Sequence, residues 1–139
     1  MLIKRFEDIE AWREARKLAI AIYKITDNAK FGKDWGMKDQ IQRASVSVMN
    51  NIAEGFDSDS KAEFRRFLGI ARRSCSEIQS ILYIAVDLIY IEKEEFNEFY
   101  EQAEKVRRMV TSFMKYLRES QTRQHANAPT RQHANAPTR

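Results

Sequence analysis

Four arginines stand close together in the middle of the sequence, at a spacing that suits the recognition of phosphate groups. Arg65 and Arg72 are seven residues apart. Arg66 and Arg73 repeat that spacing, and a helix brings residues seven apart to the same side. A guanidinium group can hold a phosphate through two parallel hydrogen bonds, and Gly69 lies between the pairs, where a backbone could be approached closely. The spacing predicts an arginine-rich helix face that binds nucleic-acid phosphates. The alternative is a solvated face, or salt bridges to nearby glutamates.

A second set of polar residues is expected along one stripe of another helix. Its members carry hydroxyl, amide or charged groups at helical spacing: Arg43, Ser47, Asn50, Asn51 and Glu54. Amides and carboxylates at such positions often form a buried hydrogen-bond network that fixes helix register or oligomeric state. We interpret this stripe as a structural polar network, with a ligand site as the alternative.

A further basic strip lies near the N-terminus, with Glu10 and Glu14 at pairing distance along the same helix. Its members are Arg13, Arg16, Lys17 and Lys24. Exposed ion pairs on a helix contribute little and are common. This strip is therefore interpreted as an ordinary solvated surface.

The sequence offers no catalytic or metal-binding constellation. Both histidines, His125 and His133, lie near the C-terminus, so the preceding 120 residues lack the commonest general base and metal ligand. Cys75 falls on an apolar seam and is interpreted as a small core residue, not a nucleophile. We predict a non-enzymatic protein with no catalytic residue, no metal and no cofactor.

Charge and hydropathy limit the cellular setting but do not by themselves indicate a nucleic-acid-binding protein. The formal net charge is +4, and three of the 24 basic residues lie after Gln121, leaving 24 − 3 = 21 against 20 acids. The preceding chain is thus close to neutral, so an argument for nucleic-acid binding must rest on local clustering. No stretch is apolar enough for a membrane span, and no signal peptide is recognisable. We expect a cytoplasmic protein, and the single cysteine agrees with a reducing compartment.

Apolar periodicity predicts four helices and no strand. Helix boundaries are expected at Asp8 as an N-cap, at Gly55 as a C′ residue, and at Ser60 with Glu63 as a capping box. The helices span about 8–27, 37–54, 60 to near 91, and from 92 onward. Short connections favour antiparallel neighbours, so the fold class is an all-α, antiparallel up-down four-helix bundle.

The third helix carries more apolar surface than one bundle can bury. Its heptad seam comprises Phe64, Leu68, Ala71, Cys75, Ile78, Leu82, Ala85 and Ile89. Past Ile78 it becomes apolar nearly all round. The additional apolar residues are Ile81, Tyr83, Ile84, Val86, Leu88, Tyr90 and Ile91. We expect the protein to bury that surplus by self-association.

The C-terminal segment contains an eight-residue sequence, TRQHANAP, repeated without change at 122–129 and 130–137. It has nothing apolar that could anchor it to a core. The predicted organisation is a four-helix bundle domain over residues 1–120 and a disordered repeat tail over 121–139.

Three segments resemble the bacterial 23S rRNA intervening-sequence protein family. They are Ile9–Tyr23, then Gln40–Gly55 with its Asn-Ile-Ala-Glu-Gly ending, then Glu63–Glu77 with its Phe-Leu-Gly-Ile-Ala-Arg core. Met49 and Arg73 depart from the family pattern, where proline and glycine are frequent. The resemblance implies an up-down bundle and a ring-shaped homo-oligomer, typically a homopentamer, with no catalytic residue. Related proteins include retroelement accessory proteins that bind nucleic acid and a reverse transcriptase.

The functional prediction is a bacterial homo-oligomer that binds RNA or DNA through basic helix faces. It would be an accessory factor for a reverse transcriptase or a protein associated with rRNA. The alternative is a protein–protein interaction scaffold that makes no contact with nucleic acid.

Overall fold

The computed structural model describes residues 2–126 and the side chains of residues 2–120. Over this range the chain is all-α with no strand, which confirms the predicted fold class. Short 3-10 turns, η1 (Phe6–Asp8) and η2 (Phe31–Lys33), precede the first two helices. The helices are α1 (Glu10–Ile25), α2 (Trp35–Phe56), α3 (Lys61–Asp87) and α4 (Lys93–Ala126).

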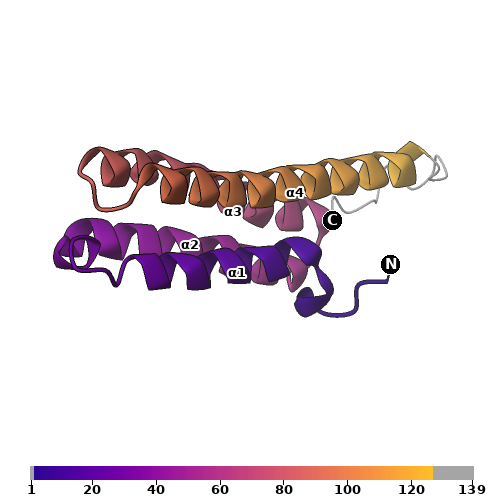
Figure 1. The fold of residues 1–139 in the computed structure, drawn as a ribbon. Coiled ribbons are helices and arrows are strands. Elements are labelled where there is room, and N and C mark those ends of the chain that lie inside the picture. Colours follow the sequence, from indigo (N-terminus) through magenta and orange to yellow (C-terminus); the bar gives the residue numbers. More distant parts are fainter. Residues whose placement is uncertain (1, 127–139) are drawn as a thin grey trace.

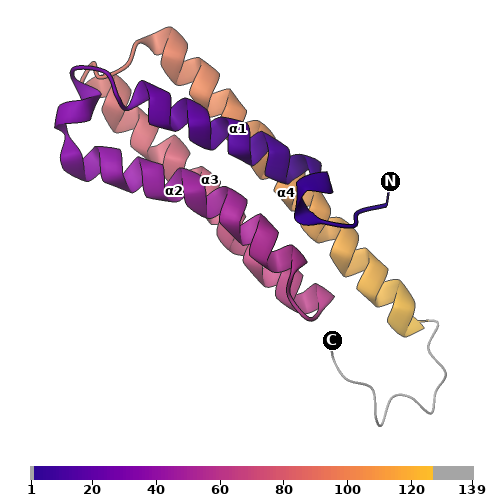
Figure 2. The same cartoon turned by 90° about the horizontal axis from the view of Figure 1, so that it is seen from below.

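The four helices run antiparallel to their neighbours, with α1 and α2 in one layer and α3 and α4 in the other (Figure 1). Both α1 and α3 pack against α2 and α4, so α1 and α3 lie diagonally across the bundle (Figure 2). The connections span residues 26–34, 57–60 and 88–92, and such short links favour pairing of each helix with the next.

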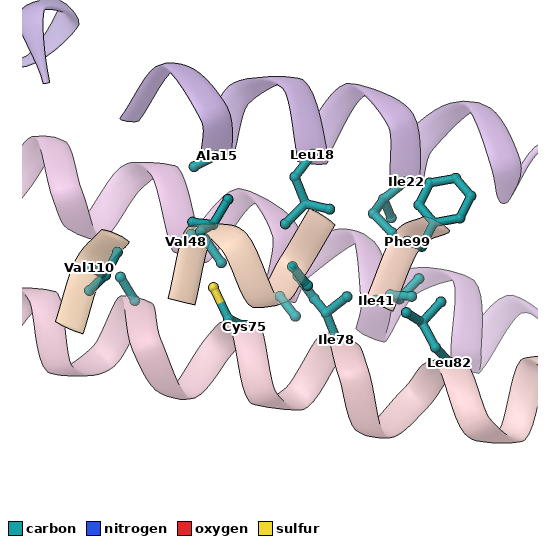
Figure 3. Packing of buried hydrophobic residues seen from close by; sticks show 14 of the residues in the cluster. Ala15, Leu18, Ile22, Ile41, Val48, Cys75, Ile78, Leu82, Phe99 and Val110 are labelled. Carbon is teal, nitrogen blue, oxygen red and sulfur yellow. The ribbon is translucent and has the colours of Figure 1, made fainter. Parts of the chain in front are cut away.

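The core forms where the predicted seams meet. On α3, the seam from Leu68 to Ala85 is buried, as predicted. Leu18 of α1, Val48 of α2 and Cys75 of α3 gather in the middle of the bundle (Figure 3). These side chains interlock from three different helices, so the heptad pattern of the sequence corresponds directly to the packed interior.

Two predicted helix boundaries are wrong and one is confirmed. Ser60 caps α3 by accepting a hydrogen bond from the Glu63 backbone N–H at 3.1 Å. Asp8, predicted to cap α1, instead accepts backbone hydrogen bonds from Lys4 and Arg5 and closes η1. Gly55, predicted as a C′ residue, lies inside α2 without a positive φ.

Gly55 has a packing role, because side chains of α3 lie directly against it. A Cβ at Gly55 would lie 2.7 Å from Cδ1 of Phe64 and 3.0 Å from Cβ of Phe67. A Cβ at Gly69 would meet only ordinary contacts, 3.8 Å from Met114 Cε and 3.9 Å from Arg73 Nη1. Gly55 and Gly69 therefore differ in the space around them.

We expect Gly55→Ala to lower the melting temperature and Gly69→Ala to leave it unchanged or raise it. Overpacking costs about 1–3 kcal/mol, whereas alanine gains up to about 1 kcal/mol over glycine inside a helix. Urea unfolding of both variants measures the difference. Equal effects of the two substitutions would show that Gly55 does not set the helix spacing.

The end of α3 carries a strained residue. Tyr90 N–H donates to Ala85 C=O at 2.8 Å and Ile89 N–H donates to Val86 C=O at 3.1 Å, the two hydrogen bonds of a Schellman motif. Ile89 occupies the left-handed position of this motif with φ of 61°, where glycine is usual. A β-branched residue there costs about 1–2 kcal/mol.

The two loops at this end of the bundle are tied together. Asn28 accepts hydrogen bonds from the Lys30 and Phe31 backbone N–H groups and donates to Tyr90 C=O at 2.9 Å. The Tyr90 hydroxyl donates to Asp34 Oδ2 at 2.9 Å, while Asp34 Oδ1 caps α2. Phe31 is fully buried beneath this network, so the predicted loop contains part of the core.

Much of the predicted apolar surplus of α3 is exposed in the single chain. Tyr83, Ile84 and Leu88 are about half exposed, while Ile81 and Ile91 are buried. The bundle therefore leaves apolar surface at one end of α3, as the sequence indicated.

The C-terminal prediction falls largely outside the described residues. Helix α4 continues to Ala126, beyond the predicted domain boundary at residue 120, and residues 127–139 of the predicted tail are not described. Within the described range, no helix combines the length and the apolar character needed to cross a membrane.

Candidate nucleic-acid interface

The four predicted arginines all lie in the first half of α3, where Ser60 starts the helix. Arg66 and Arg73 are exposed, and Arg65 and Arg72 are half-buried. We call these four residues the arginine face. Since all four are carried by one packed helix, their relative positions are fixed by the backbone.

Three members of the arginine face have no carboxylate partner. Within the part of the chain that the structure describes, no salt bridge involves Arg66, Arg72 or Arg73. The Arg66 guanidinium lies over the Phe67 ring at 4.7 Å from its centroid, a cation–π contact that leaves its N–H donors available. These guanidinium groups are therefore open to an anion from solvent.

Gly69 does not serve the arginine face as the sequence suggested. It is buried, with the Met114 methyl group and the Arg73 guanidinium at ordinary contact distance from its missing Cβ. An incoming phosphate would therefore meet guanidinium groups and not the Gly69 backbone.

The nearby glutamate of α4 is already occupied by other partners. Glu104 accepts two hydrogen bonds from Arg107, at 2.9 and 2.7 Å, and one from Gln79 of α3 at 3.0 Å. Arg108 Nη1 lies 3.6 Å from Glu104 Oε2. The hydrogen bonds from Arg107 lower the pKa of Glu104 to about 2, with Gln79 and the charges of Arg107 and Arg108 adding to the effect. Glu104 is thus committed to this network and does not neutralise the arginine face.

The Glu104 network was not foreseen in full from the sequence. The spacing of Glu104 and Arg107 on one helix was readable as an i,i+3 pair. Gln79 is on another helix, and no local pattern relates residues 25 positions apart.

Only part of the predicted polar stripe of α2 is joined by hydrogen bonds. Asn51 donates to the Ser47 hydroxyl at 3.0 Å, and Ser74 of α3 donates to the same hydroxyl at 2.9 Å. Arg43 instead pairs with Asp39 on the exposed surface. Asn50 and Glu54 are also exposed. Ser47 and Asn51 therefore take part in a hydrogen-bonded contact between α2 and α3, whose α3 member, Ser74, was not predicted from the sequence. The other three residues of the stripe lie on the surface.

The N-terminal basic strip has local partners. Arg13 donates to Glu7 C=O at 2.9 Å, and Lys17 pairs with Glu14 at 3.2 Å. Arg16 lies 6.0 Å from the Trp12 ring. Glu14 also pairs with Lys105 of α4 at 3.3 Å, so the carboxylate partner of Lys17 joins α1 to α4.

Cys75 is fully buried and free. Burial raises the pKa of its thiol to about 12, so the reactive thiolate is disfavoured. Among the described residues, no three His, Cys, Asp or Glu side chains are placed to hold a metal ion together.

Comparisons with known proteins agree with the fold and the resemblance. The family model for the 23S rRNA-intervening sequence protein matches residues 7–112. A crystal structure of a protein of unknown function from the S23 ribosomal protein family of Bacteroides thetaiotaomicron is similar. The TM-score is 0.70 at 25% identity, over 76% of this chain and 98% of that one. No curated protein matches.

Proposed function

Because the chain belongs to the 23S rRNA-intervening sequence protein family, we propose that it is a non-enzymatic homo-oligomer that binds nucleic-acid backbones. The contact surface is the arginine face of α3. The binding is weak in one subunit and is strengthened by repetition of this face in an assembly. The cytoplasm is the compartment where we expect it to work.

The observation that carries this proposal is that Arg66, Arg72 and Arg73 form no salt bridge with any residue that the structure describes. Arg66 and Arg73 are exposed two helical turns apart, a separation of about 10 Å at 1.5 Å per residue. Double-stranded nucleic acid presents phosphates every few ångströms along its backbone. Two such arginines on a fixed helix can therefore reach two phosphates of the same molecule.

Phosphate contacts, not base contacts, are expected to dominate. Helix α3 is packed against both α2 and α4, so only its outer face is free and the two neighbouring helices keep it from entering a groove. Phosphate contacts position a protein but do not read sequence. We therefore expect binding without sequence preference.

Assembly would strengthen this weak contact. Each copy adds another arginine face, and linked sites gain effective concentration along one nucleic acid. The half-exposed apolar side chains of α3 support self-association. A homopentamer, and a reverse transcriptase or ribosomal RNA as the physiological partner, stay predictions from the resemblance.

The test compares Arg66→Gln/Arg73→Gln with its parent in fluorescence anisotropy on a labelled oligonucleotide. Arg123, Arg131 and Arg139 are replaced by glutamine in both proteins, so that C-terminal charges do not contribute. Loss of two phosphate contacts is expected to weaken binding about tenfold or more at low salt. The slope of log K against log salt should become shallower by about 1.4 to 1.8.

The matched control is Arg13→Gln/Arg16→Gln, which removes the same charge from α1. This variant should bind as its parent does. Absence of binding by the parent at low salt, or equal loss in both double variants, would overturn the proposal.

The second candidate function is a protein–protein scaffold, favoured by one specific observation. Trp35 at the start of α2 is 81% exposed, and tryptophan is enriched at interaction hot spots. If nucleic-acid binding fails while the assembly persists, this candidate takes its place.

A further inference from the structure

A shallow groove crosses the outside of the bundle between α1 and α2. It has a volume of about 510 Å³, with Ile20 and Tyr23 contributing its apolar wall. Lys24 and Lys38 line it from opposite helices, and Asp27 is also part of its lining. We call this hollow the α1–α2 groove. Its character is apolar in the middle and mainly basic at the edge.

A patch of complementary character lies at the end of α3. We define the α3 patch as Tyr83, Ile84, Leu88 and Ile89, each about half exposed or more. Asp87 lies among these residues on α3, and its side chain is exposed. The patch is therefore apolar in the middle and acidic at the edge.

Ile89 gives an independent sign that the α3 patch contacts another molecule. Its backbone is in the left-handed region, with φ of 61°, yet its side chain is 66% exposed. In the single chain, the Ile89 side chain buries little apolar surface that could offset this strain. The Schellman hydrogen bonds need the left-handed backbone but not an isoleucine, and strained residues cluster at functional contacts.

We propose that the α3 patch of one copy seats in the α1–α2 groove of a second copy. This contact rests on the self-association included in the proposed function and specifies its two surfaces. Apolar side chains meet at the centre, and Asp87 faces Lys24 and Lys38. Opposite charges at an interface rim set orientation and suppress wrong partners.

The two surfaces differ, so the contact is head-to-tail. The groove includes α1, which lies diagonally across the bundle from α3 (Figure 2). Every copy in an assembly then offers one groove and one patch. Such contacts propagate from copy to copy until a ring closes, and otherwise extend as an open chain.

The arginine face stays clear of this contact. Ile84 is eleven residues beyond Arg73 on α3, which places it about 16 Å along the helix axis. Assembly and nucleic-acid binding therefore occupy different parts of α3 and can be tested separately.

The decisive experiment disables one surface at a time in the full chain. Tyr23→Asp places a charge in the apolar wall of the α1–α2 groove, and Leu88→Asp places one in the α3 patch, so each substitution disables one surface. Each variant alone should have the mass of one chain, 16.4 kDa, in light scattering at micromolar concentration. An equimolar mixture should double that mass, because the intact patch of the first variant meets the intact groove of the second.

Three outcomes would overturn the proposal. They are a monomeric parent protein, a variant that assembles by itself, and a mixture that stays monomeric. If the patch paired with itself, the Tyr23→Asp variant would still assemble. Tyr116→Glu is the control, since Tyr116 is exposed on α4 outside both surfaces, and it should assemble as the parent does.

Two further variants keep the test valid if an aspartate substitution impairs folding. Lys24→Glu and Asp87→Lys should each weaken assembly at least tenfold, and mixing these two variants should restore it. Ile89→Gly should raise the melting temperature of the dilute subunit while weakening assembly, a pair of opposite effects that a purely structural residue would not show. Nucleic-acid binding is measured separately, so an assembling parent that binds no oligonucleotide would overturn the proposed function and leave this contact standing.

Discussion

Replacing Phe31 by alanine is expected to lower the free energy of unfolding by about 3–5 kcal/mol. Phe31 is fully buried, and its ring lies 5.5 Å from that of Tyr90. Removing it leaves a cavity beneath the hydrogen bonds that join the α1–α2 loop to the α3–α4 loop. Because a domain of this size has a total stability of about 5–15 kcal/mol, the loss should be visible as a large drop in the urea midpoint.

Two control variants test whether the loss of stability comes from the burial of the Phe31 ring. Phe31→Leu keeps most of the apolar volume and should cost much less. Trp35→Ala removes a larger ring from an exposed position only four residues away and should change stability by about 0.5 kcal/mol or less. If Phe31→Ala and Trp35→Ala had similar effects on the urea midpoint, the loop residue would not belong to the core.

Glu104→Gln should lower stability at neutral pH by about 2 kcal/mol, and this loss should shrink in acid. The folded pKa of Glu104 is about 2, below the ordinary value of 4.5. A lowered folded pKa means that the carboxylate stabilises the fold above the unfolded pKa and ceases to do so as pH falls through the folded value. This shift in the pKa of Glu104 corresponds to about 3 kcal/mol of folding free energy. Solvent around the partly exposed Arg107 screens the interaction and reduces that contribution.

The measurement is the difference in unfolding free energy between Glu104→Gln and the parent from pH 7 to pH 2. We expect the difference to narrow below about pH 4.5 and to approach zero near pH 2. Glu101→Gln, on the exposed side of the same helix, removes equal charge and should show almost no difference at any pH. A constant difference across this range would mean that the ionised carboxylate is not the stabilising species.

The bundle itself was predictable because its signal is local and repeated. The seam of α3 from Leu68 to Ala85 follows heptad spacing, and all of it is buried. Ser60 was readable as a cap because its partner is only three residues away. The first helix start failed because Asp8 had a competing use, closing η1 through Lys4 and Arg5.

Long-range contacts account for what the sequence did not reveal. Phe31 lies in a glycine-containing stretch that reads as a loop, and its burial depends on Tyr90 and Asn28 from two different connections. Gly55 read as a helix terminator because a terminator needs only local backbone freedom, whereas its packing against Phe64 depends on the next helix. The arginine face was placed on one helix correctly. The burial of Gly69 under Met114 of α4 could not be read from spacing.

The buried thiol of Cys75 can be used to measure how often the bundle opens. The chain contains one cysteine, and its side chain is fully buried where three helices meet. An alkylating reagent such as iodoacetamide can reach that thiol only when the helices separate. The rate of labelling therefore measures how often the bundle opens, with no probe introduced and no other thiol competing. Comparing that rate between dilute and assembled protein would show whether association slows the opening of each subunit.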